Sequence, residues 1–365
     1  MALTLHGTVS DNTVALDRKT ATPLIINGDM QIAQRGTSTA SVSSGSTYPA
    51  LDRFMYAISD NGTFTVSQDT DVPTGQGFSK SMKFDCTTAD ASVASGSFQI
   101  IEHRLEGQNL QLLKKGTSSA ESVTVAFWVK STKTGTFILE IEDSDNGRSI
   151  AQAYTVSSSN TWEKKVLSFA GDTTGALDND NARSLRLMFW LGAGSNFTTG
   201  SLATSWASTG NNRAVGQVNS ADSTSNNFLI TGVQLEVGQF DANSIPAFQF
   251  EDVATSFFRC QRYYQNQGNN FYGMVEGTDK FRFQVPFDRP MRAAPTITAR
   301  GVGFKFNARY LGDHTTDNPT IADAASTTFC TWLGVNGTSL SANTPIYGRS
   351  QQDAAGQFLA LDSEL

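Results

Sequence analysis

Cysteine is scarce in this chain of 365 residues, and the few cysteines form no recognisable pairs. Cys86, Cys260 and Cys330 are an odd number, lie far apart and include no C-x-x-C motif. This usage argues against a disulfide framework and against the common zinc motifs. We therefore expect buried free thiols that pack as small hydrophobic side chains, in a protein made in a reducing cytoplasm.

Histidine is equally scarce. The chain has His6, His103 and His314, and none of them lies in an H-x-x-x-H or G-x-S-x-G context. We expect His103, which stands between Glu102 and Arg104, to be a surface or interface residue. The sequence therefore predicts no catalytic site, no enzyme and no cofactor.

Closely spaced carboxylates give two further patterns. Glu140 and Glu142 are two residues apart, a spacing that places them on one face of a strand. We expect them to point outward and to provide solubility and edge protection rather than the acid pair of a glycosidase. The stretch from Asp143 to Gly147 is rich in oxygen donors, but no closing acid follows at residues 151–155. A hairpin turn is the favoured interpretation, with a structural calcium as the alternative.

Charge and long apolar runs are also sparse. Charged residues make up 17% of the chain, and the net charge is −7. The missing basic footprint argues against nucleic acid, and the acidic balance argues against docking on an anionic membrane. The best apolar run, Leu185–Leu191, has the length of a strand, so we expect no membrane insertion. The first residues do not show the pattern of a secretory signal.

Short strands joined by polar turns are what remains. Glycine, serine and threonine are plentiful, and apolar residues alternate with other residues in several segments. These segments are Val123–Val129, Phe137–Ile141, Leu185–Leu191 and Phe281–Val285. Each has the period of a half-buried antiparallel strand, so the sequence predicts an all-β sandwich.

One segment has helical spacing instead. Val253, Phe257, Cys260 and Tyr264 fall on one face of a helix that would begin near Glu251. With this helix as a connector, the predicted domains are an attachment arm at 1–22, a β jelly roll at 23–248, a connecting helix at 249–267 and a distal β domain at 268–365. The first of these is polar and has too little apolar surface to fold alone. A disordered tail is the alternative to an attachment arm.

Several motifs in a fixed order resemble the tail-fibre and receptor-binding proteins of tailed bacteriophages. They are NGDMQIAQRGT at Asn27–Thr37, YPALDRF at Tyr48–Phe54, the strand Val123–Lys130, Trp162-Glu163, SFAGD at Ser168–Asp172, GVQLEVG at Gly232–Gly238, CQRYY at Cys260–Tyr264 and Phe287–Pro295. The resemblance implies a carbohydrate-binding-like jelly roll, a short helix and a smaller C-terminal β domain, assembled as a homotrimer.

The resemblance also implies a function and partners. The expected function is attachment to a host cell-surface polysaccharide, in a virion assembled in the host cytoplasm. The arm would bind other tail or virion proteins. Aromatic faces and neighbouring polar groups bind sugars, which favours a glycan site in the distal domain. The candidates are Tyr310, Asp313, His314, Asn318, Trp332, Asn336 and Tyr347, with Trp206 of the jelly roll as an alternative.

Alternatives remain for both the glycan site and the function. Each candidate aromatic could instead pack in a core or between subunits. The alternative function is a structural virion protein, such as a fibre adaptor or a capsid-decorating fibre, without direct receptor binding. A cellular carbohydrate-binding module is a third possibility, disfavoured because no export signal is present.

Overall fold

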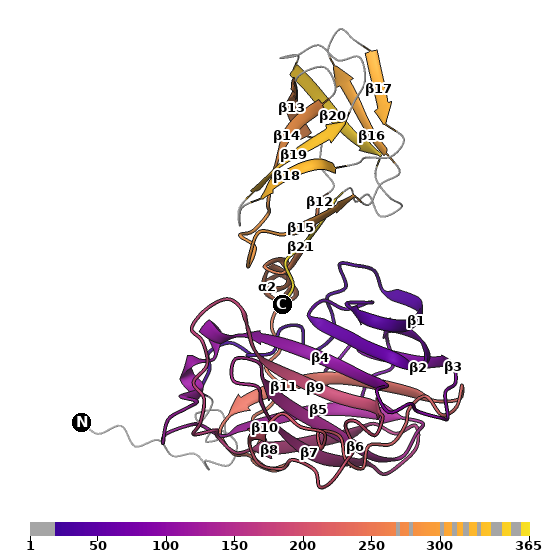
Figure 1. Ribbon diagram of the computed structural model, residues 1–365, viewed down its shortest axis with the longest axis vertical. Coiled ribbons are helices and arrows are strands. Elements are labelled where there is room, and N and C mark those ends of the chain that lie inside the picture. The colour runs from indigo at the N-terminus through magenta and orange to yellow at the C-terminus, as the bar shows by residue number, and fades with distance from the viewer. Residues whose placement is uncertain are drawn as a thin grey trace, which may run out of the picture. The chain divides into compact units, whose positions relative to one another are not determined.

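The computed structural model of the chain describes residues 19–267, 271–276, 280–299, 303–308, 312–316, 321–326, 330–336, 345–351 and 359–365 (Figure 1). Contacts between residues divide the chain into two units, Met1–Val253 with Leu365, and Ala254–Glu364. The predicted arm at 1–22 falls largely outside the described residues. The limits predicted at 248 and 267 remain predictions, and each unit is described by itself below.

The first unit contains one sheet of eleven antiparallel strands. Two single-turn 3₁₀ helices, Gly107–Asn109 and Gln111–Leu113, follow the fourth strand. The strands are β1 (Ser38–Thr47), β2 (Phe54–Asp69), β3 (Ser81–Thr88), β4 (Phe98–Glu106), β5 (Val123–Ser131), β6 (Gly135–Asp143), β7 (Arg148–Val156), β8 (Glu163–Phe169), β9 (Arg183–Ala193), β10 (Ala207–Ser208) and β11 (Asn227–Val237). Their order is β10-β7-β6-β9-β4-β2-β3-β11-β5-β8, and β1 pairs with β2.

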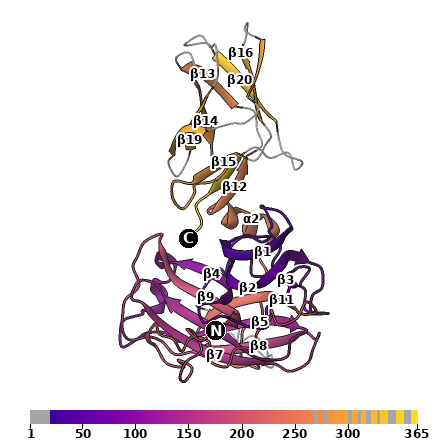
Figure 2. The ribbon, with the colours of Figure 1, turned by 45° about the vertical axis from the view of Figure 1, so that its right-hand side comes forward.

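The long strand β2 turns this sheet into two layers. Its first part, Phe54–Ser59, pairs with β4, and its second part, Thr63–Asp69, pairs with β3. Between them Asp60 has φ +47° and Gly62 has φ +75°, a left-handed geometry that bends the strand. A strand that bends at such a point can pass from one packed sheet to the other. Figure 2 shows β2, β3, β11 and β5 side by side in one of the layers.

Aromatic side chains fill the space between the layers. The ring of Phe127 on β5 lies 5.0 Å from that of Phe189 on β9 and 5.1 Å from that of Tyr154 on β7. Phe137 on β6 and Phe228 on β11 are 5.5 Å apart. Because these strands are distant from one another in the sheet order, the two halves of the sheet face each other across the core. The predicted all-β jelly-roll sandwich is confirmed.

The alternating residues lie where the sequence pattern places them. Val123, Val125, Phe127 and Val129 are all buried in this core. Cys86 and Cys260 are buried free thiols, as expected.

Glu140 and Glu142 share the face of β6 that points away from the main core, as expected, but the exposure and the edge protection expected for them are wrong. β6 lies between β7 and β9, so it is not an edge strand, and the side chain of Glu140 is 0% exposed. Glu140 accepts hydrogen bonds from Arg213 Nε at 2.7 Å and from Trp190 Nε1 at 2.9 Å. Burial raises the pKa of Glu140, and Arg213 opposes that rise. The acids bind arginines in a buried layer, since Arg186 and Arg213 both donate to Glu142.

The surface position expected for His103 is also wrong. Its side chain is fully buried, and its ring lies 5.1 Å from the ring of Phe54, edge to face. The backbone N–H of Ile26 donates to His103 Nε2 at 3.3 Å. The ring of Phe54 and the backbone at Ile26 therefore lie against the imidazole, and the sequence pattern around His103 shows neither contact.

The β6–β7 connection is a hairpin, as the favoured interpretation predicts. Asp143 pairs with Arg148, and Gly147 between them has φ +61°. Asp143 Oδ1 accepts hydrogen bonds from the backbone N–H groups of Asp145 and Asn146 at 3.0 and 3.1 Å. Throughout the described part of the chain, no group of three or more His, Cys, Asp or Glu side chains is placed to hold a metal ion.

A buried ion cluster lies beneath this hairpin; we call its four residues, Lys115, Asp143, Arg148 and Asp172, the Lys115 cluster. Lys115 Nζ donates to Asp143 Oδ2 and lies 3.0 Å from Asp172 Oδ2. It also donates to two backbone carbonyl oxygens, those of Thr174 at 3.2 Å and Gly175 at 2.8 Å. Arg148 Nε lies 2.7 Å from Asp172 Oδ2. Lys115 is only 4% exposed, so oxygen atoms of the protein replace its water shell.

Among the described residues, the second unit contains a helix and ten strands, which form two sheets. The helix is α2 (Val253–Gln261), and the strands are β12 (Tyr264–Gln267), β13 (Phe271–Glu276), β14 (Lys280–Pro286), β15 (Thr296–Ala299), β16 (Gly303–Ala308), β17 (Gly312–Thr316), β18 (Ile321–Ser326), β19 (Cys330–Asn336), β20 (Pro345–Gln351) and β21 (Leu359–Asp362). One sheet has the order β12-β21-β15, and the other has the order β17-β16-β20-β13-β14-β19-β18.

The helix is shorter than its apolar spacing predicts. Cys260 is buried as expected, but Val253 is 55% exposed. Tyr264 lies in β12, opposite Asp362 of β21, so a strand pairing distant in sequence takes it out of the helix. Glu251 precedes the first turn rather than lying in it. No helix of the described residues is long and apolar enough to cross a membrane.

Candidate functional site

The residues predicted for a glycan site in the distal domain are spread along the seven-stranded sheet. Asp313 and His314 lie in β17, Trp332 and Asn336 in β19, and Tyr347 in β20. Tyr310 and Asn318 lie outside the described residues. Asp313 is opposite Asn307 of β16, which is opposite Tyr347, so Asp313 and Tyr347 share one row of the sheet.

Trp332 is farther away along this sheet. It pairs with Gln284 of β14, and four strands stand between β19 and β17 in the sheet order. Five strand spacings of about 4.8 Å correspond to about 24 Å along the sheet. The backbone thus brings Asp313 and Tyr347 together and leaves Trp332 and Asn336 apart from them.

The alternative aromatic, Trp206, packs against protein. Its indole Nε1 donates to the backbone oxygen of Ala170 at 2.7 Å, and the ammonium of Lys115 lies 5.1 Å from its ring centroid. Trp206 therefore covers the Lys115 cluster through a cation–π contact. These contacts give Trp206 a packing role.

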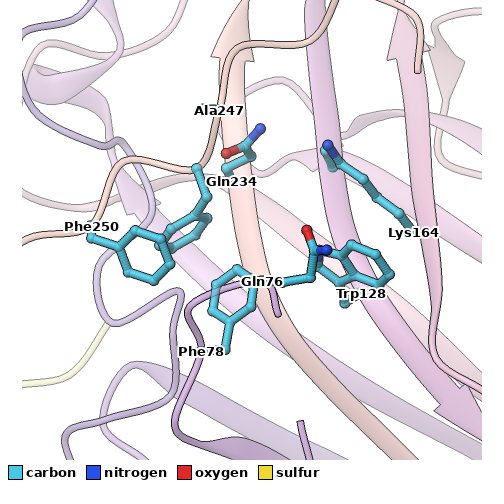
Figure 3. A pocket seen from close by; sticks show the side chains of 10 residues that line it. Gln76, Phe78, Trp128, Lys164, Gln234, Ala247 and Phe250 are labelled. Atoms are coloured by element: carbon cyan, nitrogen blue, oxygen red, sulfur yellow. The ribbon is translucent and has the colours of Figure 1, made fainter. Parts of the chain in front are cut away.

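A pocket lies on the outer face of β11, β5 and β8, in the first unit (Figure 3). It has a volume of about 230 Å³. We call it the β11 pocket. Its lining residues are Gln76, Phe78, Ala126, Trp128, Lys164, Gly232, Gln234, Ala247, Phe248 and Phe250.

The chain after β11 closes one end of this face. Thr124 alternates with core residues of β5 and so lies on the outer side, yet it is fully buried. Its hydroxyl donates to the carbonyl of Gly238 at 2.8 Å and accepts from the N–H of Phe240 at 3.0 Å. Ser168 Oγ on β8 donates to Phe240 O at 2.7 Å. The chain after β11 thus covers Thr124 and leaves the pocket farther along β5.

Gly232 shapes the floor of the pocket. The pairing of β11 with β5 shifts register between Thr231 and Gln234, and Gly232 has φ +63° there. This is a bulge, and it lets the N–H of Val233 donate to Gly28 O at 2.9 Å. A Cβ atom at position 232 would lie 2.5 Å from Phe78 Cζ. Only glycine allows the Phe78 ring to approach this closely.

Three phenylalanines form the aromatic wall of the pocket. The Phe78 ring centroid lies 5.1 Å from those of Phe248 and Phe250, and these two are 4.8 Å apart. All three pairs are tilted or edge to face, as aromatic clusters prefer. Phe250 remains 47% exposed. The wall therefore presents apolar ring surface to whatever enters.

Gln234 supplies a hydrogen-bonding group from the floor. Its side chain is buried, with 6% exposure, and Nε2 donates to the carbonyl of Pro246 at 3.0 Å. Oε1 is buried and has no hydrogen-bond partner among the described residues. Figure 3 shows this amide between the phenylalanines on one side and Trp128 and Lys164 on the other. A buried acceptor without a partner is costly, and a ligand hydroxyl would satisfy it.

Trp128 and Lys164 form the opposite side. They are directly opposite each other on β5 and β8, where side chains on one face are neighbours. Trp128 is partly buried, and Lys164 reaches the rim. Partial removal from water lowers the pKa of the Lys164 ammonium. Ala126, on the same face of β5, leaves the space between them open.

The β11 pocket combines apolar and hydrogen-bonding groups. Its ten lining residues include four aromatic side chains, two glutamines and one lysine. It offers ring faces, one free acceptor and donors from Gln76 and Lys164. Ligand pockets usually measure about 300–1,000 Å³, so this smaller one suits a compact ring or the end of a longer chain.

The sequence carried part of the signal for this pocket. Gly232 and Gln234 belong to the GVQLEVG motif, and Trp128 is an outward position in the β5 alternation. Both patterns predict strands, and neither by itself predicts a site. Phe78, Phe248 and Phe250 show no pattern that would join them.

Comparisons with known proteins give matches among solved structures. No family model and no curated protein matches the chain. Among solved structures, the chain is similar to the enzymatically active domain of tailspike protein 4 of bacteriophage CBA120, with 16% identity over 59% of this chain and 21% of that one, and a TM-score of 0.31. The chain thus spans about a fifth of that relative's length.

Carbohydrate-binding proteins are also among these similar structures. One is a putative sugar binding protein from Bacteroides thetaiotaomicron, with 13% identity over 59% of this chain and 100% of that one, and a TM-score of 0.31. Another is the CBM22-1–CBM22-2 tandem domain of Paenibacillus barcinonensis Xyn10C, with 11% identity over 96% and 99% and a TM-score of 0.31.

Proposed function

We propose that the protein is a non-catalytic bacteriophage tail-fibre or receptor-binding protein, and that its β11 pocket binds a host cell-surface glycan. The observation that carries the proposal is the unpartnered Oε1 of Gln234 on the floor of a pocket walled by aromatic rings. Sugar rings have apolar C–H faces that stack on aromatic side chains and hydroxyls that hydrogen-bond to amides. The order of motifs that resembles phage fibres supports the virion setting.

The test is binding of the labelled full-length protein to host cells and to a glycan array, with and without Trp128→Ala. We expect Trp128→Ala to weaken binding roughly 10- to 100-fold, as loss of a central aromatic contact does. Trp128→Phe keeps a ring face and should retain most of the affinity.

Trp332→Ala and Tyr347→Ala, in the distal unit, are the matched comparisons. Loss of binding with these variants and not with Trp128→Ala would move the site to the predicted distal residues. If the wild-type protein binds neither cells nor glycans, the alternative function, a structural virion protein, becomes the better hypothesis.

We also propose that the chain acts as a homotrimer whose N-terminal arm attaches to other virion proteins. A single shallow sugar site binds weakly, and linking copies on one fibre raises avidity by about a hundredfold or more without a new contact. Size-exclusion chromatography with light scattering should give three times the chain mass of 39.3 kDa. A mass equal to one chain at micromolar concentration would contradict the trimer and leave the pocket untouched.

A further inference from the structure

Lys164 is the one charged side chain among the residues that line the β11 pocket. The whole chain carries a net charge of −7, yet no carboxylate lines this site. A cation placed alone in a pocket attracts an anion of the ligand.

Other lysines near the pocket have carboxylate partners in the protein. On β8, Lys165 Nζ lies 2.6 Å from Glu163 Oε2. On β5, Lys130 Nζ lies 2.6 Å from Asp71 Oδ2. No hydrogen bond or ion pair joins the side chain of Lys164 to another residue in the part of the chain that the structure describes. The positive charge at the rim is therefore available to a ligand.

The position of Lys164 beside Trp128 gives this charge a geometric role. Because the two residues are opposite each other on adjacent strands, their Cβ atoms lie about 4.5–5.5 Å apart. The substituents of a sugar ring stacked on the indole would thus lie close to the ammonium of Lys164. On the other side of the ring, Gln234 Oε1 would accept a hydrogen bond from a sugar hydroxyl.

We infer that the β11 pocket selects a sugar with an anionic substituent, a carboxylate or a phosphate, and that Lys164 is its partner. This inference rests on the proposed function of the pocket. The acidic balance of the chain does not oppose it, because charges more than about 8 Å from the ligand are largely screened at physiological ionic strength. The selection of an anionic sugar therefore depends on Lys164 at the rim of the pocket and not on the net charge of the chain.

The experiment compares sugars that differ in one group. Methyl β-D-glucuronide carries a carboxylate where methyl β-D-glucoside carries a hydroxymethyl group, and glucose 6-phosphate carries a phosphate. The same comparison is made with the galactose series. Each is titrated against the full-length protein by ligand-observed NMR up to tens of millimolar. The variants are Lys164→Gln, which removes the charge, Lys164→Arg, which keeps it, and Lys83→Gln, a control on β3 outside the pocket.

The wild-type protein should bind an anionic member at least tenfold more tightly than its neutral partner. Lys164→Gln should abolish that preference, whereas Lys164→Arg and Lys83→Gln should preserve it. Preference for the glucuronide or for the phosphate identifies which anion the pocket takes. Equal binding of anionic and neutral sugars, or a preference that survives Lys164→Gln, overturns the inference and leaves the glycan site standing. Binding of no sugar, with cell binding unaffected by Trp128→Ala, overturns the proposed function as well.

Discussion

Replacing Lys115 by alanine should lower the free energy of unfolding by about 3–5 kcal/mol, the range found when one partner of a buried ion pair is removed. Lys115 is 4% exposed, and its ammonium is the shared partner of Asp143 and Asp172, which are 0% and 3% exposed. Without it, these carboxylates and the carbonyls of Thr174 and Gly175 lose the ammonium as a donor, although Arg148 still donates to Asp172. Urea unfolding followed by circular dichroism measures the change.

The control for Lys115→Ala is Lys133→Ala. Lys133 pairs with Asp222, and both side chains are about one-third exposed. Surface pairs contribute roughly 0–1 kcal/mol, so this variant should stay close to wild type. Equal stability losses in the two variants would contradict the role assigned to the Lys115 cluster.

Lys115→Ala should also change how the free energy of unfolding depends on pH in acid. Burial raises the pKa of Asp172, but hydrogen bonds from Arg148 and Lys115 outweigh it, so this pKa lies below its usual value of 3.8. A carboxyl whose pKa is lower in the native state than in the unfolded state stabilises the fold at every pH above its unfolded-state pKa. That contribution is lost as the pH falls through the native pKa. Below pH 3.8 the wild type should therefore lose stability more steeply than Lys115→Ala.

Replacing Gly232 by valine should destabilise the jelly roll by about 2–5 kcal/mol and abolish ligand binding in the β11 pocket. The φ of +63° disfavours a β-branched residue, and the new Cβ would lie 2.5 Å from Phe78 Cζ. Phe78 would have to leave its contacts with Phe248 and Phe250, which form the wall. Thermal unfolding and glycan titration measure the two effects.

Gly200 provides a matched control for this substitution. It has φ +82°, and an added Cβ meets nothing within 4 Å. Gly200→Val therefore introduces backbone strain of about 1–2 kcal/mol without a clash, and binding should persist. If both glycine variants lose the same stability and keep binding, Gly232 has no special part in the pocket.

The strands could be predicted from local patterns because the alternation of a strand depends only on residues that are adjacent in the sequence. Val123 to Val129 alternate in the sequence, and the core takes them as expected. Glu140 alternates in the same way, but the sequence does not show that Arg213, 73 residues later, folds over it. Burial by a distant loop turned a predicted surface acid into a buried one. The same applies to Tyr264, whose strand partner Asp362 lies near the other end of the chain.

The candidate site is harder to predict for a related reason. Trp128 and Gln234 lie on strands that the sequence pattern predicts, and their direction away from the core follows from the alternation. The walls come from Phe78, between β2 and β3, and from Phe248 and Phe250, after β11. Nothing in the sequence indicates that these segments meet. Gly232 is visible as a glycine in a strand, but the ring that requires it becomes apparent only in the folded protein.

The Lys115 cluster has a consequence for the medium in which the protein works. A dissolved cation that holds a loop stabilises it in proportion to its concentration, so dilution or a chelator weakens the fold. The ammonium of Lys115 is covalently attached to the chain, and it contacts carboxylate and carbonyl oxygens at this corner. Mass action therefore does not apply to that cation. The hairpin at Asp143 should keep the same shape in soft water, in brine and in the presence of EDTA.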